Sequence, residues 1–538
     1  MTEHTTFGID LGTTHSCIAY VDRSGRPVVV KNEIGAETTP SVVYFEKPGK
    51  VLVGSAAKNS ALLAPHLVAE MVKRDMGSRV PSDRVYHKTK YTPEEISALI
   101  LRELVRSTEK NDEFRVRDVV ITVPAHFGIA ERDATRRAGE IAKLNVLDVL
   151  DEPTAAALHY QTMQSGTGIR HVLVCDLGGG TYDTTVIRLQ DKDFQVISIA
   201  GDDKLGGADW DERIRDRLLR EFTAQHPRID PTADDVFMQD LMITAEDVKK
   251  TLSSKQSHRL GLRFGGVAAQ VEFTRAMVEE LTVDLLDRVV DVTKRVIDAA
   301  ARKGVREFDE VLLVGGMTKV PSVAAALKER LGLETRLYEP DLAVAKGAAL
   351  FAMISRAKRG RASTQQTADD LGISVGQAEA MISTNVKRVV SRGFGVKGVD
   401  PADPLALTRP MQARQIVVHL LQPDTPLPAD SGPYPFATAV DNQRMVEIEV
   451  YEQAGLVPSE EVADNTKIGR GRLTGLPAGP KGMQIDVSFV MSETGQLSVH
   501  ATEPSSGAEL RFDLQIGNMD RRAIASAQAG IAKHDVSG

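Results

Sequence analysis

The alternation of apolar and polar positions divides the chain into two regions. Residues 1–355 mix short β-rich runs with amphipathic segments, as where the apolar run 118–127 precedes the charged helical stretch 128–144. Residues 274–304 carry apolar side chains at three- and four-residue steps and end at a glycine, which predicts one long helix. The run 310–327 predicts a strand, a Gly-Gly turn and a helix. This succession of elements indicates an α/β domain over the first region.

The composition changes after Met353. Residues 356–386 are basic at first, then polar and small, without a strand-like run. This pattern predicts a linker or peripheral helix and places the domain boundary here. From 387 to 517, short alternating runs separated by turn residues predict an antiparallel β-sandwich. The tail, residues 518–538, can form one short helix at most.

Composition limits the class of protein. A chain of 538 residues is too long for one core, and three or four folding units are expected. The net charge of −8 argues against a nucleic-acid partner. The two cysteines, Cys17 and Cys175, both lie in apolar runs, which excludes a disulfide scaffold and indicates a reducing compartment. The N-terminus lacks the pattern of a signal peptide, and no apolar stretch of about 18 residues predicts a membrane span. A cytoplasmic protein without a membrane partner is expected.

Two hairpin-like segments, 6–22 and 174–187, carry nearly the same polar residues. The first turn (residues 10–14) reads Asp-Leu-Gly-Thr-Thr, and the second turn (residues 176–181) reads Asp-Leu-Gly-Gly-Gly-Thr. Glycine lets backbone amides approach an anion, threonine adds hydroxyl donors, and aspartate can hold Mg²⁺ through water. Either copy alone is also compatible with a structural hairpin. Their joint occurrence favours two turns that grip a polyphosphate from opposite halves of a duplicated α/β unit.

A third element, Leu312–Pro321, contains Gly315 and Gly316 between a buried strand and a helix. The missing side chains would let a flat ligand approach the backbone closely. Because many strand-to-helix turns use such a pair, this element alone is weak evidence for a site.

Together these motifs resemble, in content and order, the seventy-kilodalton heat-shock chaperones. The matching segments are GIDLGTTHSCIA, VITVPAHFGIAERDAT, DEPTAAALHY, CDLGGGTYD, LGGADWDERI, VKKTLSS, LLVGGMTKVP and EPDLAVAKGAAL. The resemblance spans nearly all of residues 5–355 and continues at TAVDNQRMVEIEVYEQ, which is similar to the family's peptide-binding β-sandwich. It implies a two-lobed, actin-like ATPase domain followed by that sandwich. Actin and the sugar kinases share the ATPase fold but not the sandwich.

The resemblance assigns roles to individual residues. It implies that Asp10, Asp176 and Thr181 surround magnesium and the attacking water, that Lys73 is the catalytic lysine, and that Glu152 orients a water. Without the resemblance, Lys73 would be taken for an exposed surface charge. The residues implied to bind ATP or ADP are Gly12, Thr13, Thr14, Gly178, Gly179, Gly180, Asp183, Gly206, Gly207, Glu246, Lys249, Lys250, Ser253, Gly315, Gly316, Lys319 and Asp341. Lys319 stands where the family often has arginine, which can stack on a base.

Other matches concern communication and peptide binding. Pro124 and Arg132 resemble the pair that relays the nucleotide state. The residues that align with the peptide pocket are Phe436, Ala439, Val446 and Ile448. Apolar residues at alternate positions of a strand are equally expected in a core, so both interpretations stay open. The implied partners are extended peptide segments, a J-domain co-chaperone and a nucleotide-exchange factor.

The chain also departs from the family pattern. Lys387 and Arg388 stand where the family linker has apolar and acidic residues, and a polar segment of about 25 residues precedes them. Altered coupling, with weak or no stimulation of the ATPase by peptide, is therefore expected. The loop over the peptide cleft, residues 397–412, is replaced by a sequence that contains proline and aspartate, and the short tail predicts that the helical lid is absent.

These departures leave alternatives to the chaperone. One is an ATPase-based regulatory or scaffolding protein whose sandwich binds one dedicated partner. Another is a nucleotide binder without turnover, against which the complete set of residues in both turns argues.

Overall fold

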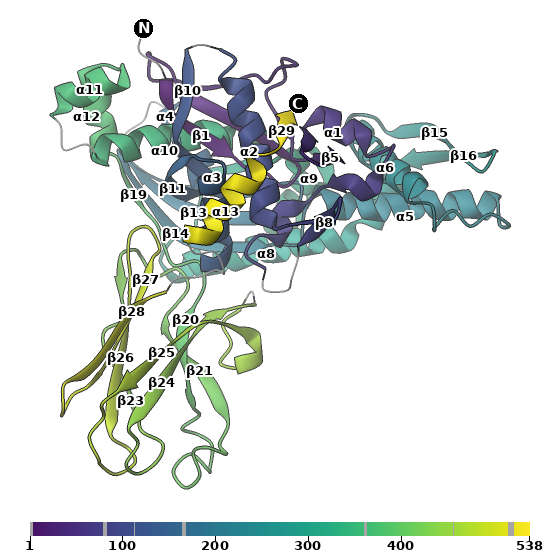
Figure 1. Cartoon of the computed structure of the whole chain (residues 1–538). Helices are drawn as coiled ribbons and strands as arrows, with labels where there is room; N and C mark the ends of the chain where they lie inside the picture. The colour runs from purple at the N-terminus through teal and green to yellow at the C-terminus, as the bar shows by residue number, and fades with distance from the viewer. Residues whose placement is uncertain are drawn as a thin grey trace.

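The computed structural model describes residues 4–78, 83–111, 113–163, 168–359, 363–455, 457–514 and 521–538, without the side chains at 370 and 371. The expected fold class is confirmed: two α/β lobes are followed by a β-sandwich, which extends to one side of them (Figure 1). Among the described residues, no helix combines the length and the apolar character that a membrane crossing requires.

Lobe I (residues 4–163) is built on a sheet with the strand order β11-β10-β1-β2-β3. The first hairpin consists of β1 (His4–Asp10) and β2 (His15–Val21), and β10 (Phe114–Val123) lies parallel beside β1. The remaining strands are β3 (Pro27–Val29) and β11 (Asn145–Asp151). Helices α2 (Pro93–Thr108) and α3 (Ile129–Ile141) supply apolar side chains to the same core as this sheet.

Lobe II (residues 168–342) repeats this arrangement. The second hairpin consists of β12 (Ile169–Leu177) and β13 (Tyr182–Gln190), and β17 (Glu310–Val314) lies parallel beside β12. The sheet order is β18-β17-β12-β13-β14-β19, with β14 at Asp193–Asp202, β18 at Arg336–Leu337 and β19 at Asn385–Lys387. Helices α4 (Glu152–Thr162) and α10 (Ala343–Arg359) share one apolar core with strands of both lobes. The two turns are thereby held at the junction of the lobes.

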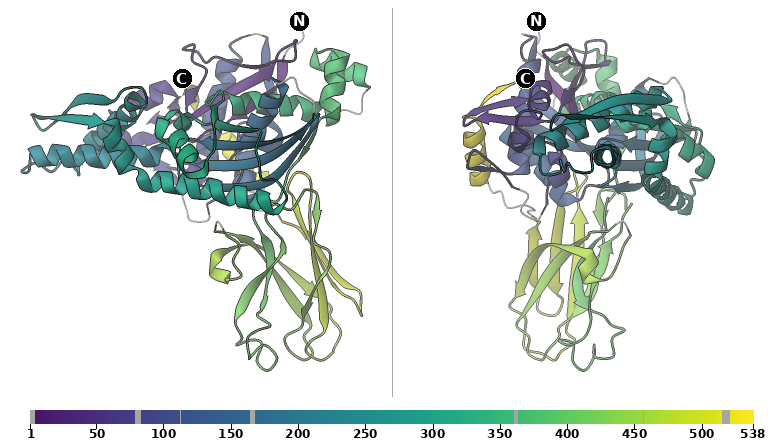
Figure 2. Two further views of the ribbon diagram at one scale, coloured as in Figure 1. Left: turned by 180° about the vertical axis from the view of Figure 1, so that it is seen from behind. Right: turned by 90° about the vertical axis from the view of Figure 1, so that its right-hand side faces the viewer.

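The outer part of lobe II consists of α5 (Gly207–Gln225), α6 (Asp235–Ser254), β15 (Ser257–Phe264) and β16 (Val267–Thr274), which project at one end of the molecule (Figure 2). The single helix predicted over 274–304 is wrong, because the structure has α7 (Arg275–Leu281) and α8 (Val283–Arg302). They separate at Thr282, whose buried hydroxyl donates to the carbonyl of Val278 at 2.8 Å. Such a bond competes with the helical pattern of the backbone. Helix α9 (Pro321–Leu331) follows β17.

The segment expected as a linker or peripheral helix contains two short helices, α11 (Thr364–Leu371) and α12 (Val375–Ser383). Each begins with a capping box, Ser363 with Gln366 and Ser374 with Gln377, which satisfies the first amides of the helix. Helix α12 buries Met381 in the core shared by the lobes. Residues 360–362 of the expected linker lie outside the described residues.

The sandwich consists of two antiparallel sheets. One has the order β21-β20-β24-β25, with β20 at Phe394–Val399, β21 at Gln415–Leu421, β24 at Met445–Gln453 and β25 at Asn465–Thr474. The other has the order β22-β26-β27-β28 and also carries β23 (Tyr434–Ala437) on β26. Its strands span Ala429–Asp430, Gln484–Met491, Leu497–Glu503 and Ala508–Asp513. The expected end of the sandwich at 517 and start of the tail at 518 lie outside the described residues.

The C-terminal tail returns to lobe I, where α13 (Arg521–Ile531) and β29 lie beside α2 (Figure 1). The helix was expected, but the strand β29 (Asp535–Ser537) was not. It pairs in parallel with β6 (Lys50–Val53) and completes the sheet β29-β6-β5-β7, in which β5 spans Val43–Lys47 and β7 spans Val68–Ala69. Ile531 and Val536 enter the core of lobe I. The tail is therefore part of the ATPase unit.

Replacing Ile531 with alanine is expected to destabilise lobe I, because the side chain is 2% exposed within its core. Truncating such a side chain typically costs about 3 kcal/mol. Thermal unfolding would show this as a lowered midpoint. Arg522→Ala, at an exposed position of the same helix, is the matched control and should melt like the wild type. Equal melting of Ile531→Ala and wild type would mean that the tail does not dock in solution.

Candidate active site

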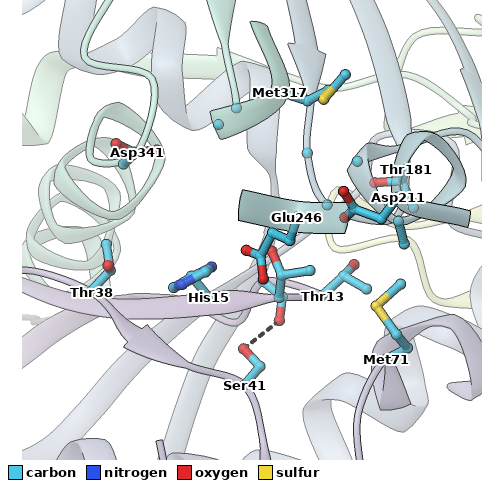
Figure 3. Close-up of a pocket in the computed structure, with 18 of the residues that line it drawn as sticks. Thr13, His15, Thr38, Ser41, Met71, Thr181, Asp211, Glu246, Met317 and Asp341 are labelled. Carbon is cyan, nitrogen blue, oxygen red and sulfur yellow. Dashed lines mark hydrogen bonds between the residues drawn. The ribbon is translucent and has the colours of Figure 1, made fainter. Parts of the chain in front are cut away.

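A cleft of about 730 Å³ lies between the lobes, and both turns line it. All of the catalytic and nucleotide-binding residues expected from the sequence line this cleft except Gly180, Asp183 and Gly206. Figure 3 looks into it, with Thr13 and His15 on the side of lobe I and Asp211, Glu246 and Met317 on that of lobe II.

The two turns touch one another. A Cβ added to Gly179 would lie 2.3 Å from the side chain of Thr14, and one added to Gly180 would lie 2.5 Å from that of Thr13. Any larger residue at these glycines would therefore force the turns apart. The glycines allow two polar backbone segments from different lobes to approach the same space.

The backbone amides of both turns are open to a ligand. Carbonyl groups are bound by the protein: the hydroxyl of Ser41 donates to the Gly12 oxygen at 2.8 Å, and its amide donates to the Thr14 oxygen at 2.8 Å. Within the described part of the chain, no acceptor is found for the amides of Thr13, Thr14, Gly179, Gly180 and Thr181. Converging amides without acceptors form a site for an anion such as a phosphate group.

Lys73 also lines the cleft, lies in the 3-10 turn Val72–Asp75, and is only 6% exposed. Its ammonium group donates to Glu152 at 2.5 Å. Burial opposes its charge, but the carboxylates of Glu152 and Asp10 outweigh burial and raise the pKa of Lys73. The side chain is therefore a fixed positive charge beside the open amides.

Carboxylates outnumber this cation. Burial raises the pKa of Asp10 and Asp176, and raises that of Glu152 to about 7, although Lys73 acts in the opposite direction on each. Such shifts indicate negative charge without sufficient compensation. The donor set fits a hard divalent cation such as Mg²⁺, which prefers oxygen ligands. No group of three or more His, Cys, Asp or Glu in the described ranges could hold a metal by itself, so phosphate and water would complete the coordination.

The other end of the cleft suits a nucleoside. Gly315 has φ +82°, and a Cβ there would lie 2.4 Å from the Leu177 oxygen, so the backbone needs glycine to pass. Lys319 pairs with Asp341 at the rim, and the charge of Lys319 is therefore shared with an acid. Apolar residues face the same space, namely Met242, Ile243, Met317, Pro340 and Val344.

An ion pair spans the cleft at this end. Lys58 of lobe I donates to Glu246 of lobe II at 2.5 Å. Burial opposes the charge of Glu246, but Lys58 and Lys250 lower its pKa to about 2. Lys249 is held by Asp211 at 2.7 Å, and burial raises the pKa of Asp211 to about 6.

Sequence reasoning missed several residues of the cleft: His15, Lys58, Arg74 and Asp211. His15 and Arg74 directly follow Thr14 and Lys73, so their positions in the chain were a usable signal. Nothing in the sequence places Lys58 opposite Glu246, since 188 residues separate them.

Asp183 lies behind the second turn and does not face the cleft. It is fully buried, and one of its carboxylate oxygens accepts hydrogen bonds from the amide and the Nδ1 of His126, at 3.1 and 2.7 Å. Burial lowers the pKa of His126, but Asp183 outweighs it, and the net pKa is raised. Arg392 and Asp203 also act on the imidazole, with opposite signs.

The His126–Asp183 pair predicts a pH-dependent stability. Because the pKa of His126 is raised on folding, its contribution is fully present below the ordinary value of about 6.5 and is lost as the pH rises through the raised value. The stability advantage of wild type over His126→Gln should therefore be largest below about pH 6.5 and shrink as the pH rises above it. Denaturant melts at several pH values would measure it, with the exposed His66→Gln as control. An advantage that stays constant with pH would contradict a charged pair.

The loop after β10 connects the cleft to the sandwich. Arg132 binds Asp151, the neighbour of Glu152, and donates to the carbonyls of Ala125 and Phe127 at 3.1 and 2.9 Å. Pro124 begins this loop. On the other side of the loop, Ser391 donates to the Phe127 oxygen at 3.1 Å. The amide of Ile129 donates to the carboxylate of Glu452 in the sandwich. Arg392 donates to the His126 oxygen and forms an ion pair with Glu131.

The segment before the sandwich is docked on the ATPase domain. Strand β19 (Asn385–Lys387) pairs in parallel with β14. Arg388 forms an ion pair with Asp148 at 3.0 Å and donates to the carbonyls of Val149 and Glu493. Both charged side chains are about one tenth exposed. The basic residue that departs from the family pattern thus finds an acid on lobe I.

The four residues expected at a peptide pocket do not share one environment. Phe436 and Val446 pack at the edge of the sandwich core and remain partly exposed. Ala439 is partly exposed, and its amide binds the side chain of Gln443. Ile448 is 2% exposed and belongs to the core itself, so in this structure it offers no surface to a ligand.

Comparisons with known proteins agree with this geometry. The family model described as "Hsp70 protein" matches residues 6–376 and 374–528. "Chaperone protein DnaK" of Thermosipho africanus (strain TCF52B) is 36% identical over 517 residues, which cover 93% of this chain and 78% of that protein. Hsp70 proteins bind ATP or ADP and are ATPases. The chain therefore belongs to the Hsp70 family of ATP-dependent chaperones.

Proposed function

We propose that the cleft hydrolyses ATP through the residues gathered at its two turns. The observation that carries this proposal is the buried Lys73, held among Asp10, Glu152 and Asp176 in the same cleft as amides for which the described residues supply no acceptor. Steady-state release of phosphate from MgATP tests it. Turnover above background supports the proposal, and nucleotide binding without turnover contradicts it.

In this proposal, phosphoryl transfer to water depends on positioning and charge neutralisation. The amides of both turns bind the phosphate oxygens, and Lys73 neutralises charge on the transferred group. Glu152 and Thr181 orient the attacking water. Asp10 and Asp176 would hold magnesium, mainly through water, and the ion would neutralise phosphate charge.

Asp176→Asn is expected to lower magnesium-dependent hydrolysis by about tenfold or more. The substitution removes one negative charge from the cluster of carboxylates, with Asp10 and Glu152, that favours the cation. The measurement is turnover against magnesium concentration, where the half-saturating concentration should rise. The exposed Asp216→Asn, on α5, is a control. Unchanged rate and magnesium dependence would remove Asp176 from the site.

We further propose that nucleotide state is coupled to peptide binding through the docked linker. The supporting contacts begin at Asp151, which precedes Glu152 and binds Arg132. Arg132 donates to the loop after β10, and Arg392 donates to the same loop from the side of the sandwich. The Arg388–Asp148 pair fixes the linker beside this path. The altered charge of the linker is thus matched by lobe I, which argues for retained stimulation by peptide.

The sandwich is proposed to bind extended apolar peptide segments by backbone hydrogen bonds, with Phe436 and Val446 nearest to a side-chain pocket. A J-domain co-chaperone and a nucleotide-exchange factor are the proposed partners, and the cytoplasm is the proposed compartment, with a role under stress. The regulatory alternative has no specific support in the comparisons. Binding to a peptide array distinguishes the chaperone from the regulatory alternative. Binding of many short apolar segments supports the chaperone, and binding of none of them supports one dedicated partner.

A further inference from the structure

Arg74 reaches across the cleft to the second turn. It follows Lys73 in the 3-10 turn of lobe I, and its guanidinium group contacts Gly180 and Asp209 of lobe II. Nε and Nη2 donate to the Gly180 oxygen at 3.0 and 2.8 Å, and Nη2 donates to Asp209 at 2.5 Å. The arginine and the aspartate are less than one fifth exposed.

The other carbonyls of the second turn are bound within lobe II. The amides of Gly207 and Ala208, at the start of α5, donate to the oxygens of Gly178 and Gly179 at 3.0 and 2.9 Å. The amide of Gly178 donates to the oxygen of Thr181 at 3.0 Å. Among the described residues, the oxygen of Gly180 receives its side-chain hydrogen bonds from Arg74 alone. Lobe II thus leaves one carbonyl of the turn to be held from the opposite lobe.

This one carbonyl affects the direction of the amides. A trans peptide unit is planar, with its oxygen and its N–H on opposite sides, so fixing the Gly180 oxygen on Arg74 also fixes the direction of the amide of Thr181, a residue that lines the cleft. Asp209 strengthens the arrangement, since the carboxylate oxygen that binds Arg74 also accepts the amide of Gly206 at 2.7 Å. The guanidinium group is suited to this task because its planar fork can hold a carbonyl and a carboxylate together.

We propose that Arg74 is a positioning residue that couples closure of the cleft to the orientation of the second turn. When the lobes separate, the bonds to Gly180 and Asp209 break, and the turn loses its fixed geometry. When they close, the turn presents its amides to the phosphates. This inference rests on the proposed phosphate site, and it explains how lobe movement sets catalytic competence without a contact between Arg74 and the reacting atoms.

Arg74→Met tests the proposal. Turnover is expected to fall about tenfold or more, since charge-assisted hydrogen bonds are lost, with a smaller change in the KM for ATP. Arg74→Lys, with one donor group in place of the fork, should retain part of the rate. Arg213→Met, which removes an exposed ion pair from α5, is the matched control and should keep the wild-type rate.

A second readout distinguishes positioning from general stability. Trp210 is the single tryptophan of the chain, is fully buried and directly follows Asp209. Its fluorescence should change when MgATP binds to wild type, and this change should be lost in Arg74→Met and reduced in Asp209→Asn. Because both variants remove the same contact, the double variant should be no slower than Arg74→Met alone.

The outcomes separate this inference from the proposed function. Absence of turnover in the wild type contradicts the proposed function. Wild-type turnover with an unchanged rate and fluorescence response in Arg74→Met overturns the role of Arg74 alone. If Arg74→Met does not fold, Arg74→Lys and Asp209→Asn decide: wild-type kinetics in both overturn the proposal, and a reduced rate with a reduced Trp210 response supports it.

Discussion

Replacing Lys73 with alanine is expected to lower ATP turnover by about 100-fold or more while nucleotide binding remains measurable. The ammonium group is buried, is bonded to Glu152, and is the cation next to Asp10 and Asp176. Without it, the charge that develops on the transferred phosphate loses this buried positive partner. Binding survives because the amides of both turns and the nucleoside end of the cleft stay in place.

Single-turnover hydrolysis and nucleotide titration measure the two quantities separately. Lys328→Ala is the control, since this lysine is exposed on α9 and pairs with Glu334 at the surface. A variant that turns over like the wild type would remove Lys73 from the mechanism. A variant that no longer binds nucleotide would instead make Lys73 a binding residue.

Replacing Asp148 with arginine is expected to undock the linker and abolish stimulation of the ATPase by peptide. In the wild type this acid lies between Arg388, at 3.0 Å, and Arg136, at 3.9 Å. The substitution places three positive side chains together where two of them are largely buried, and removing one partner of a buried pair costs about 3–5 kcal/mol. Limited proteolysis of the linker should become faster, and peptide should no longer change turnover.

The double variant Asp148→Arg/Arg388→Asp restores one acid between two bases and should recover docking and stimulation. This recovery is the matched control, since it separates the charge pair from other effects of substitution. Continued stimulation in Asp148→Arg alone would show that the pair does not hold the linker.

The chemistry of the two turns could be predicted from the sequence because it is local. Each turn joins the strands of a hairpin, and its glycines and threonines are adjacent in the chain. The position of Lys73 could not be derived in this way. Its burial depends on Glu152, 79 residues away, and only the resemblance to a family pointed to it.

Features that join distant segments were missed for the same reason. The three residues of β29 carry no strand pattern of their own, and their partner β6 lies at the other end of the chain. Arg388 departs from the family pattern, and its partner Asp148 lies in a distant segment of the chain, so the ion pair could not be predicted from the sequence. The helices α11 and α12 are a different case, because a peripheral helix was one of the two expectations for this segment and their capping boxes were present in the sequence.

Turnover of MgATP by the full chain, measured with and without an unfolded apolar peptide, tests the central claim most directly. A docked linker and an assembled cleft predict hydrolysis that peptide accelerates several-fold. Hydrolysis at the same rate with and without a peptide that demonstrably binds would contradict the proposed coupling between the cleft and the sandwich.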